Sequence, residues 1–74
     1  MPPLPALSGV QLIKILEAKG FQQVRQSGSH VRLRHPDGRA TTIPVHGGRS
    51  LGKGLLRAIL RQIDLGFEEL KSKP

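Results

Sequence analysis

The stretch HVRLRHPDGRATTIPV, residues 30–45, decides the fold. Apolar and basic residues alternate in its first five positions, which is typical of a strand with one buried face. Pro36-Asp37-Gly38 then combines three residue types that favour a turn. Past the turn, alternate positions again share one face, and they are held by Thr41, Ile43 and Val45. The sequence therefore predicts a β-hairpin with strands His30–His35 and Arg39–Val45.

Upstream of the hairpin, the sequence predicts another strand and, before it, a helix. Phe21–Ser27 is bounded by turn residues, so we expect a strand with Val24 directed toward the core. Residues 9–19 carry apolar residues at helical spacing, and Ser8 with Gln11 forms a capping-box pattern at their start. The apolar positions of this helix are Val10, Leu12, Ile13 and Leu16.

A second helix is predicted downstream of the hairpin. Apolar residues recur there at i, i+3, i+4 and i+7, at Leu56, Ile59, Leu60 and Ile63. Gly52 and Gly54 are both poor residues for a helix interior, so the sequence leaves the first residue of this helix open. Leu65-Gly66 marks its end, and Phe67–Lys71 is expected to add one short helical turn.

The element order is thus α-β-β-β-α, which places the chain in the α+β class. A three-stranded antiparallel sheet with two helices on one face leaves its other face in water. Double-stranded RNA-binding domains share this order. The 74 residues form one domain, 1–74. We divide it into a proline-rich lead-in (1–7), a core (8–65) and a C-terminal tail (66–74).

The distribution of charge indicates a polyanionic partner. Eight basic residues and a single acidic residue lie between Arg25 and Arg61, so the whole net charge of +7 resides in this segment. A local excess of this kind is the electrostatic footprint of a nucleic-acid site. The competing interpretation is a solvated basic face on a soluble protein.

Several classes of protein are excluded or disfavoured by composition. The chain has no cysteine, which rules out disulfides and thiol catalysis. It lacks a signal-peptide pattern and any long apolar run, so we expect a cytoplasmic protein without membrane contact. His30 and His35 have opposite parity on one strand and few carboxylates are near, so no metal is expected. We expect no cofactor.

Strand parity predicts which charged residues meet on the uncovered face of the sheet. If Val31 and Leu33 face the helices, the intervening residues face water. That face would then carry His30 among three arginines, with His46 at its rim, whereas His35 has the parity of the core. The three arginines are Arg25, Arg32 and Arg34. An imidazole can move a proton near neutral pH and guanidinium groups bind phosphate bidentately, which suits cleavage of a phosphodiester.

The second helix offers another basic surface. Lys53, Arg57 and Arg61 are four residues apart and so lie along one face, with Arg49 just before the helix. Like charges at this spacing repel one another, a cost that a bound anion would offset. The alternative is again a solvated helix face.

The chain resembles the HicA mRNA interferase toxins. The resemblance runs from about Ser8 to Leu65 and is carried by SGVQLIKILEAKGFQQVRQ (8–26) and GSHVRLRHPDGRATTIPVHGGRSLGKGLLRAIL (28–60). The markers are Gly28-Ser29-His30, the Pro36-x-Gly38 turn and Pro44-x-His46, in that order. One departure is Leu55, where the family often has threonine.

The resemblance implies a function and a site. It implies a fold of the double-stranded RNA-binding type, a metal-independent ribonuclease that cleaves mRNA, and a HicB antitoxin that covers the active site. The family's catalytic histidine follows Gly-Ser and corresponds to His30, next to Ser29. His46 corresponds to the second histidine motif and is a possible second catalytic residue.

Three hypotheses remain on the sequence alone. The first is an endoribonuclease toxin with His30 as general acid or base and Arg25, Arg32 and Arg34 near the phosphate. The other residues expected to bind RNA are Ser29, Arg49, Lys53 and Arg57. The second is a non-catalytic RNA-binding module that uses the cations of the second helix and recognises the shape of A-form RNA. The third, ranked last, is a DNA-binding adaptor, because no helix-turn-helix is evident.

Overall fold

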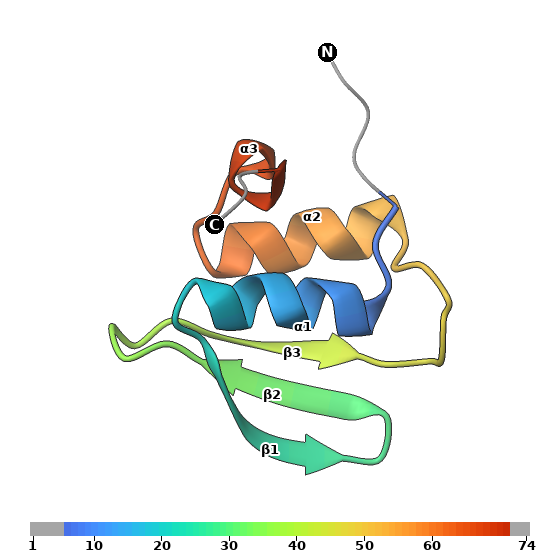
Figure 1. Cartoon of the computed structure of the whole chain (residues 1–74), viewed down its shortest axis with the longest axis horizontal. Helices are drawn as coiled ribbons and strands as arrows, with labels where there is room; N and C mark the ends of the chain where they lie inside the picture. The colour runs from blue at the N-terminus through green and yellow to red at the C-terminus, as the bar shows by residue number, and fades with distance from the viewer. Residues whose placement is uncertain (1–5, 72–74) are drawn as a thin grey trace.

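A computed structural model describes residues 6–71 of the chain. The elements are α1 (Gly9–Ala18), β1 (Gln22–Ser27), β2 (His30–Arg34), β3 (Ala40–Pro44), α2 (Lys53–Gln62) and α3 (Phe67–Lys71). The predicted order α-β-β-β-α is confirmed, as is the last short helical turn, while the proline-rich positions 1–5 lie outside the described residues. Figure 1 shows β1 at the edge of the sheet farthest from α2.

The three strands form one antiparallel sheet in the order β1-β2-β3. The β2–β3 pairing is regular from His30 opposite Pro44 to Arg34 opposite Ala40. The predicted hairpin is therefore confirmed, with strands one or two residues shorter than expected because the pairing stops short of Val45.

The β1–β2 pairing contains an irregularity at Val24 that the sequence did not predict. Gln23 pairs with Leu33 and Arg25 pairs with Arg32, so Val24 is an extra residue in a β-bulge. The Val24 side chain is 55% exposed. Its predicted place in the core is wrong, because the inserted residue breaks the alternation on which that prediction depended.

The core lies between the helix-covered face of the sheet and the two main helices. Val31, Leu33 and Ile43 point into it from β2 and β3. The helices contribute Leu12, Ile13, Leu16, Leu56, Ile59, Leu60 and Ile63. Val10 was expected to join them, but it is 41% exposed because it points past the edge of this cluster. No helix of residues 6–71 lies over the other face of the sheet.

Two local features fix α1 on the sheet. The Ser8 side chain accepts a hydrogen bond from the Gln11 backbone and the Gln11 side chain accepts one from the Ser8 backbone, which confirms the capping box. Gly9 is buried against the carbonyl group of Pro44, where a Cβ atom would overlap the oxygen. The start of α1 thus approaches the end of β3 at backbone distance.

The second helix begins at Lys53, with Gly52 as its N-cap and no side-chain capping bond. The segment that leads into α2 is held by the residues just before α1, since the Leu51 N–H donates to the Leu7 carbonyl at 2.7 Å. Among residues 6–71, no helix is both long enough and apolar enough to span a membrane.

Candidate active site

The uncovered face of the sheet holds a shallow hollow at the end where the β1–β2 turn lies. Cross-strand pairs share a face, and Ser27 pairs with His30 while Arg25 pairs with Arg32. Arg32 also pairs with Thr42 of β3. These five side chains line a hollow of about 320 Å³. The structure therefore brings His30, Arg25 and Arg32 together, as the strand parity predicts.

His30 owes its position to the turn that precedes it. It is the first residue of β2, and Gly28 in the turn has a φ of 59°, a left-handed conformation that glycine adopts readily. The His30 side chain is exposed and has no hydrogen-bond partner within residues 6–71. Its imidazole is therefore free to exchange protons with a ligand in the hollow.

The three predicted arginines do not share one environment. Arg32 Nη1 donates to Thr42 Oγ1 at 3.1 Å, a bond across β2 and β3. Arg25 lines the same hollow without a partner in the described chain. Arg34 lies on the same face but lines a neighbouring hollow of about 330 Å³ with Gln22 and Val24. Arg34 therefore does not line the hollow that contains His30.

The segment after β3 brings a second histidine to the same end of the sheet. The Val45 N–H donates to the Ser29 carbonyl at 2.6 Å, which extends the β2–β3 contact past Pro44. His46 follows directly and is exposed at this rim. The Ser29 carbonyl therefore holds the segment that carries His46.

Two residues of the hollow, Ser27 and Thr42, were not predicted as site residues. Thr42 has the parity of the uncovered face, so its place on this face follows from the sequence, but its bond to Arg32 does not. Ser27 becomes opposite to His30 only through the register of a two-residue turn. Both contribute hydroxyl groups that can donate to or accept from a phosphate.

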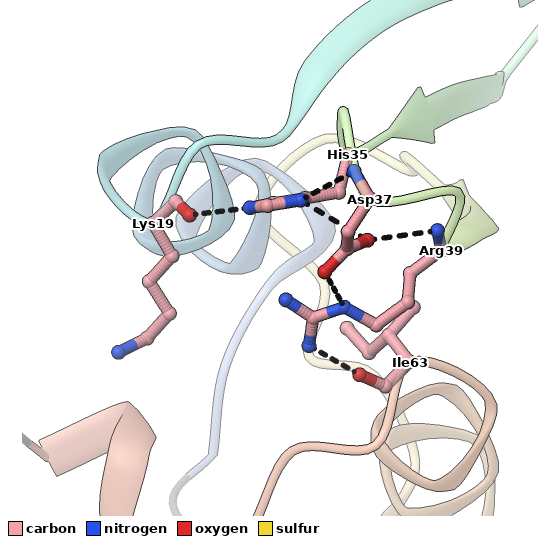
Figure 2. A network of polar contacts seen from close by, with 5 residues as sticks. All are labelled: Lys19, His35, Asp37, Arg39 and Ile63. Atoms are coloured by element: carbon pink, nitrogen blue, oxygen red, sulfur yellow. Dashed lines mark hydrogen bonds and ion pairs between the residues drawn. The ribbon is translucent and has the colours of Figure 1, made fainter.

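His35 has a structural role, as its parity predicts. Figure 2 shows the imidazole between Lys19 and Asp37. Nε2 lies 3.2 Å from the Lys19 carbonyl oxygen, and Nδ1 accepts from the Asp37 N–H at 3.1 Å. Since a carbonyl oxygen can only accept, Nε2 is the donor to Lys19, and Nδ1 also lies 3.1 Å from Asp37 Oδ1. The ring also packs edge-on against Phe21, with centroids 5.0 Å apart.

Arg39 belongs to the same network, and two of its side-chain nitrogens already have partners there. Its Nε donates to Asp37 Oδ2 at 2.8 Å and its Nη1 donates to the Ile63 carbonyl at 2.8 Å. Figure 2 shows how the side chain reaches from the turn after β2 to the end of α2. The backbone N–H of Arg39, followed by its side chain, lowers the pKa of the Asp37 carboxyl below its ordinary value. One of the eight cations counted in the basic segment therefore stabilises the fold.

The basic residues of α2 lie on the helix-covered side of the sheet, where they are exposed to solvent. Leu56, Ile59 and Leu60 turn toward the sheet, so Lys53, Arg57 and Arg61 face away from it. Arg57 also lies 5.9 Å above the ring of Phe67. Arg49 is exposed in the loop before α2. The structure thus places the cations of α2 on the other side of the sheet from the hollow beside His30, whereas the Arg49 N–H donates to the His46 carbonyl at 3.2 Å.

Potential metal ligands do not gather on the described part of the chain. Residues 6–71 contain no cluster of three or more histidine, aspartate or glutamate side chains that could hold a metal ion. In particular, His30 and His35 lie on opposite faces of the sheet, as expected from their parity.

Comparisons with known proteins bear on this arrangement. Residues 9–65 match the family model described as the HicA toxin of bacterial toxin–antitoxin systems. The chain is also 34% identical over 50 residues to a protein of Pseudomonas fluorescens (strain Pf0-1) called probable mRNA interferase HicA. That match covers 68% of this chain and 82% of the relative. The span agrees closely with the resemblance found from the motifs, and the chain belongs to the HicA toxin family.

Proposed function

We propose that this toxin is a metal-independent endoribonuclease that cleaves mRNA, with His30 as its general acid or base. The observation that carries the proposal is the exposed His30 imidazole in a hollow shared with Arg25 and Arg32. The hollow combines a group that moves protons near neutral pH with two groups that bind phosphate. The name of the Pseudomonas relative supports mRNA as the substrate.

The proposed reaction uses the RNA's own 2′-hydroxyl as nucleophile. His30 takes the proton from this hydroxyl, and the oxygen attacks the adjacent phosphorus. The bond from phosphorus to the 5′-oxygen breaks, and that oxygen receives a proton. The products are a 2′,3′-cyclic phosphate and a free 5′-hydroxyl. Arg25 and Arg32 bind the scissile phosphate, and a guanidinium at this position stabilises the negative charge that develops on the phosphorane.

His46 is the proposed donor of the second proton. It lies at the same end of the sheet as His30 because the Val45–Ser29 hydrogen bond holds the chain there. Ser29 is then a positioning residue. Arg34 extends the cationic surface toward the next nucleotide, because it lies on the same face in the adjacent hollow.

The experiment that tests the proposal compares an RNA oligonucleotide with the same sequence carrying one 2′-deoxy position. Both are incubated with the protein in excess chelator. Cleavage of the RNA, and loss of cleavage only at the substituted position, is the expected result. Cleavage of the 2′-deoxy position would overturn the proposal, since the attacking hydroxyl is missing there. Loss of RNA cleavage in chelator would overturn its metal independence.

A second candidate function is RNA binding without cleavage, through the α2 cations Lys53, Arg57 and Arg61. The observation that favours it is the row of outward-facing cations on α2, a helix whose sequence contains no carboxylate. Binding without cleavage by the wild-type protein would support this function. If the protein is a ribonuclease, the same surface binds a part of the RNA that lies away from the cleavage site.

The proposed partner is a HicB-type antitoxin, as expected for a toxin of a toxin–antitoxin family. We expect it to cover the uncovered face of the sheet, since this blocks RNA from His30. The proposed compartment is the cytoplasm, where mRNA is translated.

A further inference from the structure

We propose that Thr42 is a positioning residue that orients Arg32 toward the phosphate at which the RNA is cut. This inference rests on the proposed ribonuclease function and assigns separate tasks to the arginines of the uncovered face. Arg32 acts on the transition state, whereas Arg25 and Arg34 contribute to binding.

The hydrogen bond between Arg32 and Thr42 is the first observation. Arg32 Nη1 lies 3.1 Å from Thr42 Oγ1, and the two residues are directly paired on neighbouring strands. Both side chains line the hollow that contains His30. Thr42 is itself half-buried, and its β-branched side chain has few rotamers on a strand. The acceptor is therefore held in place by the sheet.

The contrast with the other arginines is the second observation. Among residues 6–71, the side chains of Arg25, Arg34 and His30 have no hydrogen-bond or ion-pair partner. Arg32 is thus the arginine of this face whose guanidinium already has a hydrogen-bond partner before RNA binds. Because Arg32 also lies two residues from His30 on β2, its fixed guanidinium and the imidazole project from the same face.

A fixed guanidinium favours the transition state over the ground state. The phosphorane carries more negative charge than the diester, and donors that already point at it need no reorganisation when this charge develops. Thr42 engages Nη1 alone, so Nη2 and Nε remain to donate to two phosphate oxygens. The Thr42 O–H also remains free to donate. Flexible arginines such as Arg34 attract the RNA but lose entropy on binding it.

The test compares three substitutions at one position, Thr42→Val, Thr42→Ser and Thr42→Ala. Valine keeps the shape and β-branching but removes the acceptor, whereas serine keeps the hydroxyl. Steady-state cleavage of an RNA oligonucleotide should show kcat lowered about three- to tenfold by valine and alanine, with KM changed less than twofold. Serine should restore kcat to within twofold of the wild type. The side chain is on the uncovered face, so all three proteins should fold, which circular dichroism will verify.

Arg34→Gln is the matched control on the same face. It should raise KM and leave kcat near the wild-type value, because this guanidinium has no fixed orientation. In an Arg32→Gln background, Thr42→Val should have no further effect on kcat, since the group it orients is gone.

The outcomes separate this inference from the function on which it rests. An unchanged kcat in Thr42→Val, or additive effects of Thr42→Val and Arg32→Gln, would overturn the positioning role while leaving the ribonuclease function intact. A wild-type protein that cleaves no RNA would overturn both.

Discussion

His35 Nε2 donates to the carbonyl oxygen of Lys19 across 3.2 Å, which joins the turn after β2 to the end of α1. This imidazole lies on the helix side of the sheet, whereas the imidazole of His30 lies on the other. Two histidines five positions apart thus have different surroundings, and substitution should distinguish them.

We expect His35→Ala to destabilise the fold by about 1–3 kcal/mol. The substitution leaves the Lys19 carbonyl and the Asp37 N–H without partners, and it removes the imidazole that packs against the Phe21 ring. His30→Ala should change stability by less than about 0.5 kcal/mol, as is usual for an exposed side chain. Urea unfolding of both variants measures the difference. Equal free energies of unfolding would contradict the assignment.

Gly9→Ala should destabilise the protein although alanine has the higher helix propensity. A Cβ atom at this position would overlap the Pro44 carbonyl oxygen, which is part of the backbone and cannot turn away. We expect a loss of about 1–3 kcal/mol in the free energy of unfolding. Gly54→Ala, in the first turn of α2, is the control, because open space surrounds that position and the substitution should be neutral or stabilising. A Gly9→Ala protein as stable as the wild type would show that α1 can move off β3 without cost.

The Asp37 carboxylate should make stability depend on pH in the acidic range. Hydrogen bonds from Arg39 lower its pKa in the folded state below that of the unfolded chain. The unfolded state therefore binds more protons between the two pKa values. The stabilisation is fully present above about pH 4 and is lost as the pH falls through the folded pKa. In urea titrations from pH 6 downward, Asp37→Asn should remove this contribution, and an unchanged pH profile would argue against it.

How far the sequence predicts this fold can be judged from particular residues. The alternation of Val31 and Leu33 with basic residues correctly placed His30 and Arg32 on the uncovered face, because one buried face imposes a period of two. Arg25 was also placed correctly, yet by an argument that put Val24 in the core. The bulge moved Val24 out while its neighbour stayed on the expected face. An inserted residue of this kind has no signal in the hydrophobic pattern.

The candidate site was predicted less completely than the fold. The charge count treated Arg39 as one more cation for RNA, whereas its guanidinium binds Asp37 and the Ile63 carbonyl. The bond from Arg32 to Thr42 was missed as well. Both are contacts between side chains and distant groups, and they depend on strand register and rotamer, which local periodicity does not encode.

The cations of α2 should contribute to RNA affinity without contacting the scissile phosphate. Lys53→Gln is the cleanest variant, because Arg57 also packs on Phe67. For a single-stranded RNA long enough to reach α2, it should reduce the slope of log affinity against log salt by about 0.7. Lys14→Gln, an exposed cation on α1, should leave the slope unchanged. Fluorescence anisotropy at several salt concentrations supplies both values, and equal effects of the two substitutions would make the α2 surface an ordinary solvated face.

The most direct test of the account is the 3′ end left on the RNA by the wild-type protein and by His30→Ala in chelator. Mass spectrometry should identify a 2′,3′-cyclic phosphate from the wild type, and His30→Ala should form it about 10²–10⁴ times more slowly while remaining folded. Cleavage by His30→Ala at the wild-type rate would contradict the catalytic role of this imidazole.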